Sequence, residues 1–460
     1  MGRVRVLIAT ALVGAALAGP AWAQSRPQPA PRADRASGVV VPDDNPSRDS
    51  LRWVPRVLLF VPRWTAWALA QPVRGAAWAW DRYDLDAHTG GVLLATGGPF
   101  GLFPVVEVES GFGAGAGVRA IGRDLFGEDE AATARARFGG RVTQGYQLAA
   151  DTGTRFDPAR LELAAAFDDR PAERFFGLGN GAVAAAPPMP VDALAGDLAA
   201  ATRYRRRGGS ASVGVGLGLA AAVDARLSTG LIVGRYDDPN DVDRDVPITS
   251  VYQPSSLVGF DRGETTSYSE LAVTFDDRQR PDTLSEALFS TGWRLAGWAG
   301  VGRGLGRDRA RYLRYGLWLE RTLDLYGGTR VLWLRARGEA LAGRLDRLPF
   351  AQLPALGGAQ LLRGYATDRF RDRAAAVATA EYRFELLDRA SAFLFADAGR
   401  VWASVGDATL RGLRVGYGGG VELYGHHSFL ARLELATSID GGLFVALTLD
   451  PAGDPRARAR

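Results

Sequence analysis

The chain has 460 residues and contains no cysteine. Without cysteine there can be no disulfide framework, no iron–sulfur cluster and no thiolate zinc site. Only three histidines are present, His88, His426 and His427, which are too few to favour a multi-histidine metal site. We therefore expect neither a metal nor a cofactor.

Lysine is also absent, so all 55 basic residues are arginines. Codon usage in a genome rich in G and C would produce this bias by itself. The alternative is selection for the planar guanidinium, which pairs with phosphate or carboxylate in a fork. The 51 acidic residues nearly balance the arginines and leave a formal net charge of +4. This balance argues against a nucleic-acid-binding protein, which would carry a basic patch.

Uninterrupted apolar runs are rare, and the clearest one lies at the N-terminus. Arg3 and Arg5 precede the apolar residues 6–18, and residues 21–23 form a small-x-small cleavage motif. This order predicts a signal peptide over residues 1–23, because the apolar run is too short for a transmembrane helix. We therefore expect export to the cell envelope.

The two segments that follow differ in composition. Residues 24–50 are rich in proline, arginine, aspartate and serine and are predicted to form a disordered linker. Residues 51–90 are rich in tryptophan and arginine and are interrupted by Pro62 and Pro72. This segment is predicted either to lie in the membrane interface, where tryptophan and arginine favour the headgroup level, or to form a short periplasmic helical pair under a barrel.

Between about Phe100 and Leu449, apolar and polar residues alternate with a period of two. In residues 376–386, one face carries Ala378, Ala380, Tyr382, Phe384 and Leu386, and the other carries Thr379, Glu381, Arg383 and Glu385. Aromatic residues recur on the apolar faces, as they do in membrane girdles. Together with the signal peptide, this pattern predicts an all-β fold, a transmembrane antiparallel β-barrel over residues 91–450.

The length of the barrel region predicts the number of strands. About 350 residues, at roughly 22 per strand with its connection, give about 16 strands. The long connections, residues 169–199, 237–266 and 342–372, are expected outside the cell, and the short turns in the periplasm. Residues 451–460 are predicted to form a polar C-terminal tail.

Four short motifs occur within this region, three of them in order within roughly the last hundred residues. They are Leu362-Arg363-Gly364-Tyr365, Glu381-Tyr382-Arg383-Phe384, Phe395-Ala396-Asp397-Ala398-Gly399 and, upstream, Arg174-Phe175-Phe176-Gly177-Leu178-Gly179-Asn180. With these motifs the chain resembles the outer-membrane assembly-factor barrels of the BamA/TamA, or bacterial surface antigen, type. The resemblance implies that the Arg-Gly-aromatic tip of a long loop folds back into the lumen.

The alternation pattern agrees with this implication. Glu381 falls on the polar face of its segment, and Asp397 can also face the lumen on the neighbouring one. A guanidinium is planar and can bond two carboxylates at once. We therefore predict that Arg363 tethers the loop to Glu381 and Asp397 inside the barrel. The alternative is an Arg363 that is simply solvated at a loop tip.

Four further residues belong to the same predicted site. Gly364 and Tyr365 complete the signature loop, and Phe395 and Gly399 complete the strand motif around Asp397. Glycine has no Cβ, so Gly364 and Gly399 are expected to allow close backbone approach.

Two features depart from the family pattern. Members usually carry periplasmic POTRA modules of βααββ pattern, whereas residues 24–99 show no such pattern, and we expect these modules to be absent. The family's last strand commonly ends on an aromatic residue, whereas this chain ends in its polar tail.

The resemblance implies insertion or translocation of proteins at the Gram-negative outer membrane, helped by a weak seam between the first and last strands. Expected partners are outer-membrane lipids, lipopolysaccharide and client outer-membrane proteins, but not nucleic acid. The alternative is a non-catalytic pore, or a barrel that serves lipid or envelope homeostasis. No enzyme is predicted, because His426 and His427 fall in a predicted turn with only Ser428 as a nearby nucleophile.

Overall fold

The computed structural model describes residues 100–109, 113–193, 198–241, 245–278, 291–306, 309–326, 330–387, 390–424 and 429–449. Four predicted segments lie outside these residues: the signal peptide, the linker, the Trp/Arg-rich segment and the polar tail. The region in which we expect no POTRA modules and the turn with His426 and His427 also lie outside them. No helix within the described ranges is long and apolar enough to cross a bilayer.

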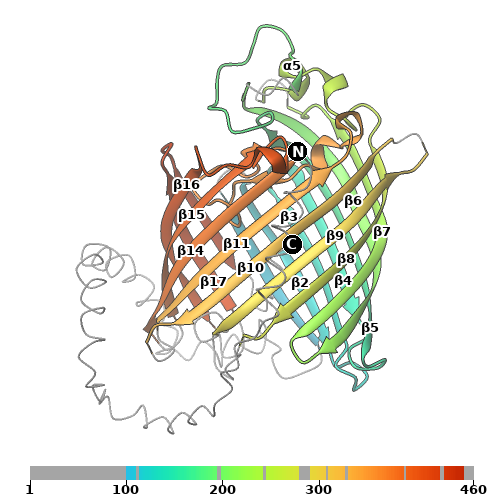
Figure 1. Cartoon of the computed structure of the whole chain (residues 1–460), viewed down its shortest axis with the longest axis vertical. Helices are drawn as coiled ribbons and strands as arrows, with labels where there is room; N and C mark the ends of the chain where they lie inside the picture. Colours follow the sequence, from blue (N-terminus) through green and yellow to red (C-terminus); the bar gives the residue numbers. More distant parts are fainter. Residues whose placement is uncertain are drawn as a thin grey trace, which may run out of the picture. The chain divides into compact units, whose positions relative to one another are not determined.

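In the described part of the chain, sixteen antiparallel strands close into one barrel. Figure 1 shows the closed barrel. In chain order they are β1 (Phe100–Glu109), β2 (Gly113–Arg123), β3 (Ala131–Gly139), β4 (Thr143–Asp151), β5 (Ala159–Phe175), β6 (Thr202–Ala220), β7 (Val223–Asp237), β8 (Glu264–Asp276), β9 (Gly292–Gly304), β10 (Arg311–Asp324), β11 (Arg330–Ala342), β14 (Ala374–Leu387), β15 (Ala390–Trp402), β16 (Arg414–Tyr424), β17 (Phe429–Ser438) and β18 (Leu443–Leu449). Each pairs with the next barrel strand along the chain, and β1 closes the barrel against β18. The predicted all-β barrel and its strand number are confirmed.

Short elements occupy the connections. Strands β12 (Ala355–Leu356) and β13 (Phe370–Arg371) pair with each other between β11 and β14. The short helices are α5 (Ile248–Val251) and the 3-10 turns η2 (Gly140–Val142), η4 (Pro254–Ser256), η5 (Leu345–Arg347), η6 (Phe350–Gln352) and η7 (Val405–Asp407). None of these elements contributes to the barrel wall.

The period-two pattern separates an outward from an inward face on each strand. On β10, Leu317 is 57% exposed and Glu320 only 2% exposed. Leu313 and Tyr315 share the outward face with Leu317, whereas buried Tyr312 shares the inward face with Glu320. An apolar exterior suits lipid, and a polar lumen satisfies the charged side chains.

Loop length orients the barrel in the membrane. The three long connections, residues 176–201, 238–263 and 343–373, each follow an odd-numbered barrel strand and so leave the same end, which we call the outer end (top of Figure 1).

One predicted boundary was wrong: β5 runs on through Asp169 to Phe175. The strand continues because Asp169 forms an ion pair with Arg205 on β6 at 2.7 Å. The charged residue that suggested a loop is therefore paired within the sheet.

The long loops pack together over the outer end around Phe350 of η6. The Phe350 ring is 3% exposed and lies 5.0, 5.4, 5.8 and 6.1 Å from the rings of Tyr236, Tyr204, Phe175 and Phe260. These four rings come from β7, β6, β5 and the 238–263 loop. We call this five-ring cluster the aromatic cap; it anchors the 343–373 loop to the β5–β7 side of the barrel.

Phe350→Ala should loosen the aromatic cap. A buried Phe→Ala change costs about 3–5 kcal/mol, because it removes apolar contacts and leaves a cavity. We expect a lower unfolding temperature and faster cleavage of the 343–373 loop by added protease. Leu345→Ala in the same loop is the matched control, since Leu345 is 46% exposed and should matter little. Equal protease resistance in the two variants would show that Phe350 does not hold the cap.

Candidate functional site

The 343–373 loop enters the barrel at its tip. Leu362 and Gly364 both have left-handed backbone angles, with φ of +59° and +87°. These two residues turn the chain around Arg363, whose exposed fraction is only 2%. A guanidinium buried to this degree must find its hydrogen-bond partners inside the protein.

The partners of Arg363 are carboxylates on three strands. Asp397 on β15 accepts hydrogen bonds from the Arg363 backbone N at 2.9 Å, from Nε at 2.7 Å and from Nη2 at 2.8 Å. Nη1 donates to Glu381 Oε2 on β14 at 2.8 Å and lies 3.5 Å from Glu434 Oε2 on β17. The Phe395 ring lies against the guanidinium, with its centroid 3.4 Å from Cζ. Charge-assisted, fork-like bonds of this kind are about twice as strong as neutral ones.

Arg363 belongs to a larger buried charge network. Its members are Arg335, Arg363, Arg383 and Arg432 and the acids Glu381, Asp397, Glu422 and Glu434, so four positive and four negative formal charges cancel. Arg383 donates to Glu381 and Glu422, each at 2.7 Å. Arg432 donates to Glu422 and Glu434, each at 2.6 Å. Buried charges are tolerated only when paired in this way.

The carboxylates keep the loop-tip arginine charged. Burial by itself lowers the pKa of Arg363, but the hydrogen bonds that Arg363 donates to Asp397 and the charge of Glu381 outweigh burial and raise the pKa above its ordinary value. Arg363 therefore keeps its positive charge in the physiological pH range.

Glycines allow the loop tip to lie directly on the strands. A Cβ on Gly416 of β16 would overlap the backbone carbonyl of Arg363, and a Cβ on Gly364 would overlap the backbone of β17. At Gly399 on β15, a Cβ would lie 3.1 Å from Leu356 of the same loop. The backbone-to-backbone approach at Gly416 is therefore as much a part of the site as the ion pairs.

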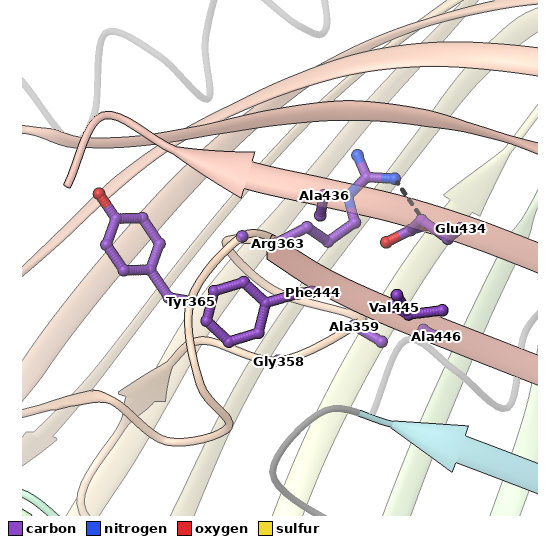
Figure 2. A pocket seen from close by; sticks show the side chains of 10 residues that line it. Gly358, Ala359, Arg363, Tyr365, Glu434, Ala436, Phe444, Val445 and Ala446 are labelled. Atoms are coloured by element: carbon purple, nitrogen blue, oxygen red, sulfur yellow. Dashed lines mark ion pairs between the residues drawn. The ribbon is translucent and has the colours of Figure 1, made fainter. Parts of the chain in front are cut away.

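Tyr365 extends the contact toward the last strand. Its hydroxyl donates to Asp440 Oδ2, in the β17–β18 turn, at 2.9 Å. Burial and this hydrogen bond raise the pKa of Tyr365 to about 12, so it remains a donor. Figure 2 shows the loop tip beside Glu434 of β17 and Phe444 of β18, which line a small pocket with it. The tip thus reaches the strands that flank the barrel closure.

The upstream motif reaches the same region from the other side of the barrel. The Asn180 amide donates to Val401 O at 2.8 Å and accepts from Val401 N at 3.1 Å. Arg414 Nη2 donates to Asn180 O at 2.6 Å, and Gly179 N donates to Arg371 O at 2.8 Å. The 176–201 loop therefore runs from β5 to β15 and β16 and lies against the 343–373 loop, which carries Arg363.

The structure brings the residues singled out in the sequence into one site. These are Arg363, Gly364, Tyr365, Glu381, Phe395, Asp397 and Gly399. Sequence reasoning missed Glu422, Arg432, Glu434 and Gly416 as parts of it. Arg432 and Glu434 alternate with Leu433 and Leu435, which would have placed them in the lumen. Alternation does not show, however, which lumen residues a loop tip reaches.

Arg363→Ala should lower the temperature at which the barrel unfolds in a gel-shift assay. Removing one partner of a buried ion pair costs about 3–5 kcal/mol of folding free energy. Water in the lumen screens the remaining carboxylates, so we expect a loss at the lower end of this range or below it. Arg363→Lys should recover only part, because one ammonium cannot replace the fork. The Arg363→Ala/Asp397→Ala double change should be less than additive. A plain sum of the single effects would exclude the Arg363–Asp397 tether.

Gly416→Ala should displace the loop tip although it changes no charge. The added methyl group overlaps the Arg363 carbonyl, so we expect a loss of stability of about 1–3 kcal/mol, as for overpacking elsewhere. The matched control is Gly338→Ala on β11, where the nearest atom to the new Cβ is 4.0 Å away. If the two variants unfold at the same temperature, the loop tip does not lie against β16.

Comparison with known proteins gives the family. Residues 125–440 match the Omp85 superfamily domain. Among solved structures, BamA from Haemophilus ducreyi lacking POTRA domains 1–3 is similar at 13% identity and a TM-score of 0.52, over 76% of this chain and 70% of that one. CdiB from Acinetobacter baumannii and from Escherichia coli match at 12% and 11% identity, both with a TM-score of 0.48 and over 76% of this chain, but over only 60% and 63% of their own length. No protein of curated function matches in sequence. Because the family model covers well over half of its length, this chain belongs to the Omp85 superfamily of outer-membrane barrels.

Proposed function

We propose that this barrel inserts proteins into the outer membrane, or moves them across it, at the seam between β1 and β18. The observation that carries the proposal is the unequal pairing of β1. It pairs with β2 over its full length, Phe100–Glu109, but with β18 only over residues 106–109. Among the described residues, 100–105 therefore have no strand partner on the β18 side.

The incompletely paired edge of β1 offers backbone groups that another strand can bond. Backbone N–H and C=O groups without partners are costly in hydrocarbon, because no water is there to bond them. An incoming strand can satisfy such an edge by adding to the sheet. The β7–β8 ladder, in contrast, is continuous over residues 223–234 and offers no edge. The seam is thus the place where strands exchange partners at the lowest cost, and the proposed activity needs no catalytic side chain.

The buried charge network supports the wall beside this seam. Glu434 lies on β17, which pairs with β18 over residues 431–437. Tyr365 holds the β17–β18 turn through Asp440. We propose that the tether keeps β14–β17 in place, so that opening is confined to β1 and β18. In this role Arg363 is a positioning residue rather than a group that touches the client protein.

A disulfide across the seam tests the proposal. Val108 and Leu447 are cross-strand partners, and the chain has no cysteine of its own, so Val108→Cys with Leu447→Cys can form only one intramolecular bridge. In proteoliposomes, the oxidised variant should lose the ability to accelerate folding of a client barrel. Reduction should restore that ability.

The matched control places the same bridge inside the continuous wall. Val108→Cys with Ala114→Cys joins β1 to β2 at paired positions, and its activity should survive oxidation. Full activity of the oxidised seam variant would rule out lateral opening at β1 and β18. Ion conductance by the wild-type barrel without any client folding would instead support the pore hypothesis.

A further inference from the structure

Two exposed arginines face each other on the lipid side of the barrel. Arg303 of β9 and Arg311 of β10 are direct cross-strand partners. Both point outward, because the inward neighbours are buried Tyr312 and Gly302, where a Cβ would collide with the Tyr312 ring. Like charges placed directly opposite each other destabilise a sheet. This pair therefore calls for a negative counter-charge.

The part of the chain that the structure describes does not supply this counter-charge. Within it, neither Arg303 nor Arg311 forms an ion pair with a carboxylate. A second outward pair, Arg207 and Arg235 on β6 and β7, shows the contrast. There, Asp237 lies 3.3 Å from Arg207 and provides an acid. No described acid pairs with Arg303 or Arg311 in this way.

The depth of the pair indicates where the anion comes from. On β10 the outward residues are, in order, Arg311, Leu313, Tyr315, Leu317, Leu319 and Arg321. At the inner end, Arg321 stacks on Trp293 at 4.9 Å, as expected at a membrane interface. The 321 − 311 = 10 residues span about 34 Å along the strand. A tilt of roughly 45° reduces this to about 24 Å, close to the height of the apolar band of such barrels.

We propose that Arg303 and Arg311 form a binding site for the phosphate of a phosphorylated glycolipid in the outer leaflet. Their depth places both guanidiniums at the outer headgroup level, so a lipid phosphate reaches them without leaving the membrane. A guanidinium fork matches phosphate geometry, and two opposed forks can clasp one phosphate between them. The negative charge of the phosphate then offsets the repulsion between the two guanidiniums. In the outer leaflet of the outer membrane, the phosphorylated glycolipid that fits this site is lipopolysaccharide.

Binding of fluorescent lipopolysaccharide to the purified full chain in nanodiscs tests the site. Arg303→Gln/Arg311→Gln should weaken binding about tenfold, since hydrogen bonds to charged groups are lost. Removing the phosphates from the lipopolysaccharide should weaken binding to the wild type by a similar factor. The matched control is Arg344→Gln, because exposed Arg344 already has an acid, Asp346, at 3.0 Å. Its binding should equal that of the wild type.

Two further measurements keep the test decisive. Arg303→Lys/Arg311→Lys retains both charges but loses the forks, and it should bind between the wild type and the glutamine variant. Without the glycolipid, the gel-shift unfolding temperature of the glutamine variant should be no lower than that of the wild type, because the change removes the repulsion between Arg303 and Arg311. Wild-type affinity in the glutamine double variant would overturn the proposal. Displacement of the lipid by millimolar inorganic phosphate would overturn it as well, because the site would then bind a free anion.

Discussion

The site depends on one buried guanidinium. Arg363 satisfies Asp397 with three hydrogen bonds and Glu381 with one, and it does so from the tip of a loop rather than from the barrel wall. The carboxylates tolerate burial because this cation and its neighbouring arginines neutralise them. The loop tip can come close enough only because Gly416 presents bare backbone to it. Charge pairing and backbone approach therefore determine each other.

The loop that carries Arg363 is held at two places. Phe350 fixes it in the aromatic cap on the β5–β7 side, and Arg363 fixes it on the β14–β17 side, only 363 − 350 = 13 residues later. β12, between the two anchors, pairs with β13, which follows Arg363, and this pairing joins the two arms of the loop. The wall from β5 to β17 is thus joined across the outer end of the lumen. The seam between β1 and β18 lies outside this joined part and, among the described residues, has the shortest pairing in the barrel.

How much the sequence could predict depends on the range of each signal. Period-two alternation is local, so it predicted the barrel and the lumen faces of Glu381 and Asp397, and the length of the alternating region predicted the number of strands. A motif added Arg363. The contacts of Phe350 were beyond such reasoning, because Phe175 lies 350 − 175 = 175 residues away and no local pattern encodes that approach. The role of Gly416 could not be predicted either, because it depends on how far the loop tip enters the barrel. The end of β5 was misjudged because Asp169 resembles a loop residue until Arg205 is placed beside it.

Hydrogen–deuterium exchange of the barrel in nanodiscs tests most directly whether the network stiffens the wall beside a weak seam. Amide exchange reports local opening, and weakly paired strands open at lower free energy. We expect faster exchange in β1 and β18 than in β6 and β7. We also expect Arg363→Ala to speed exchange in β17 and β18 but to leave β6 and β7 unchanged. Equal protection around the whole barrel, unaffected by Arg363→Ala, would show that the seam is not weak and that Arg363 does not stiffen the wall beside it.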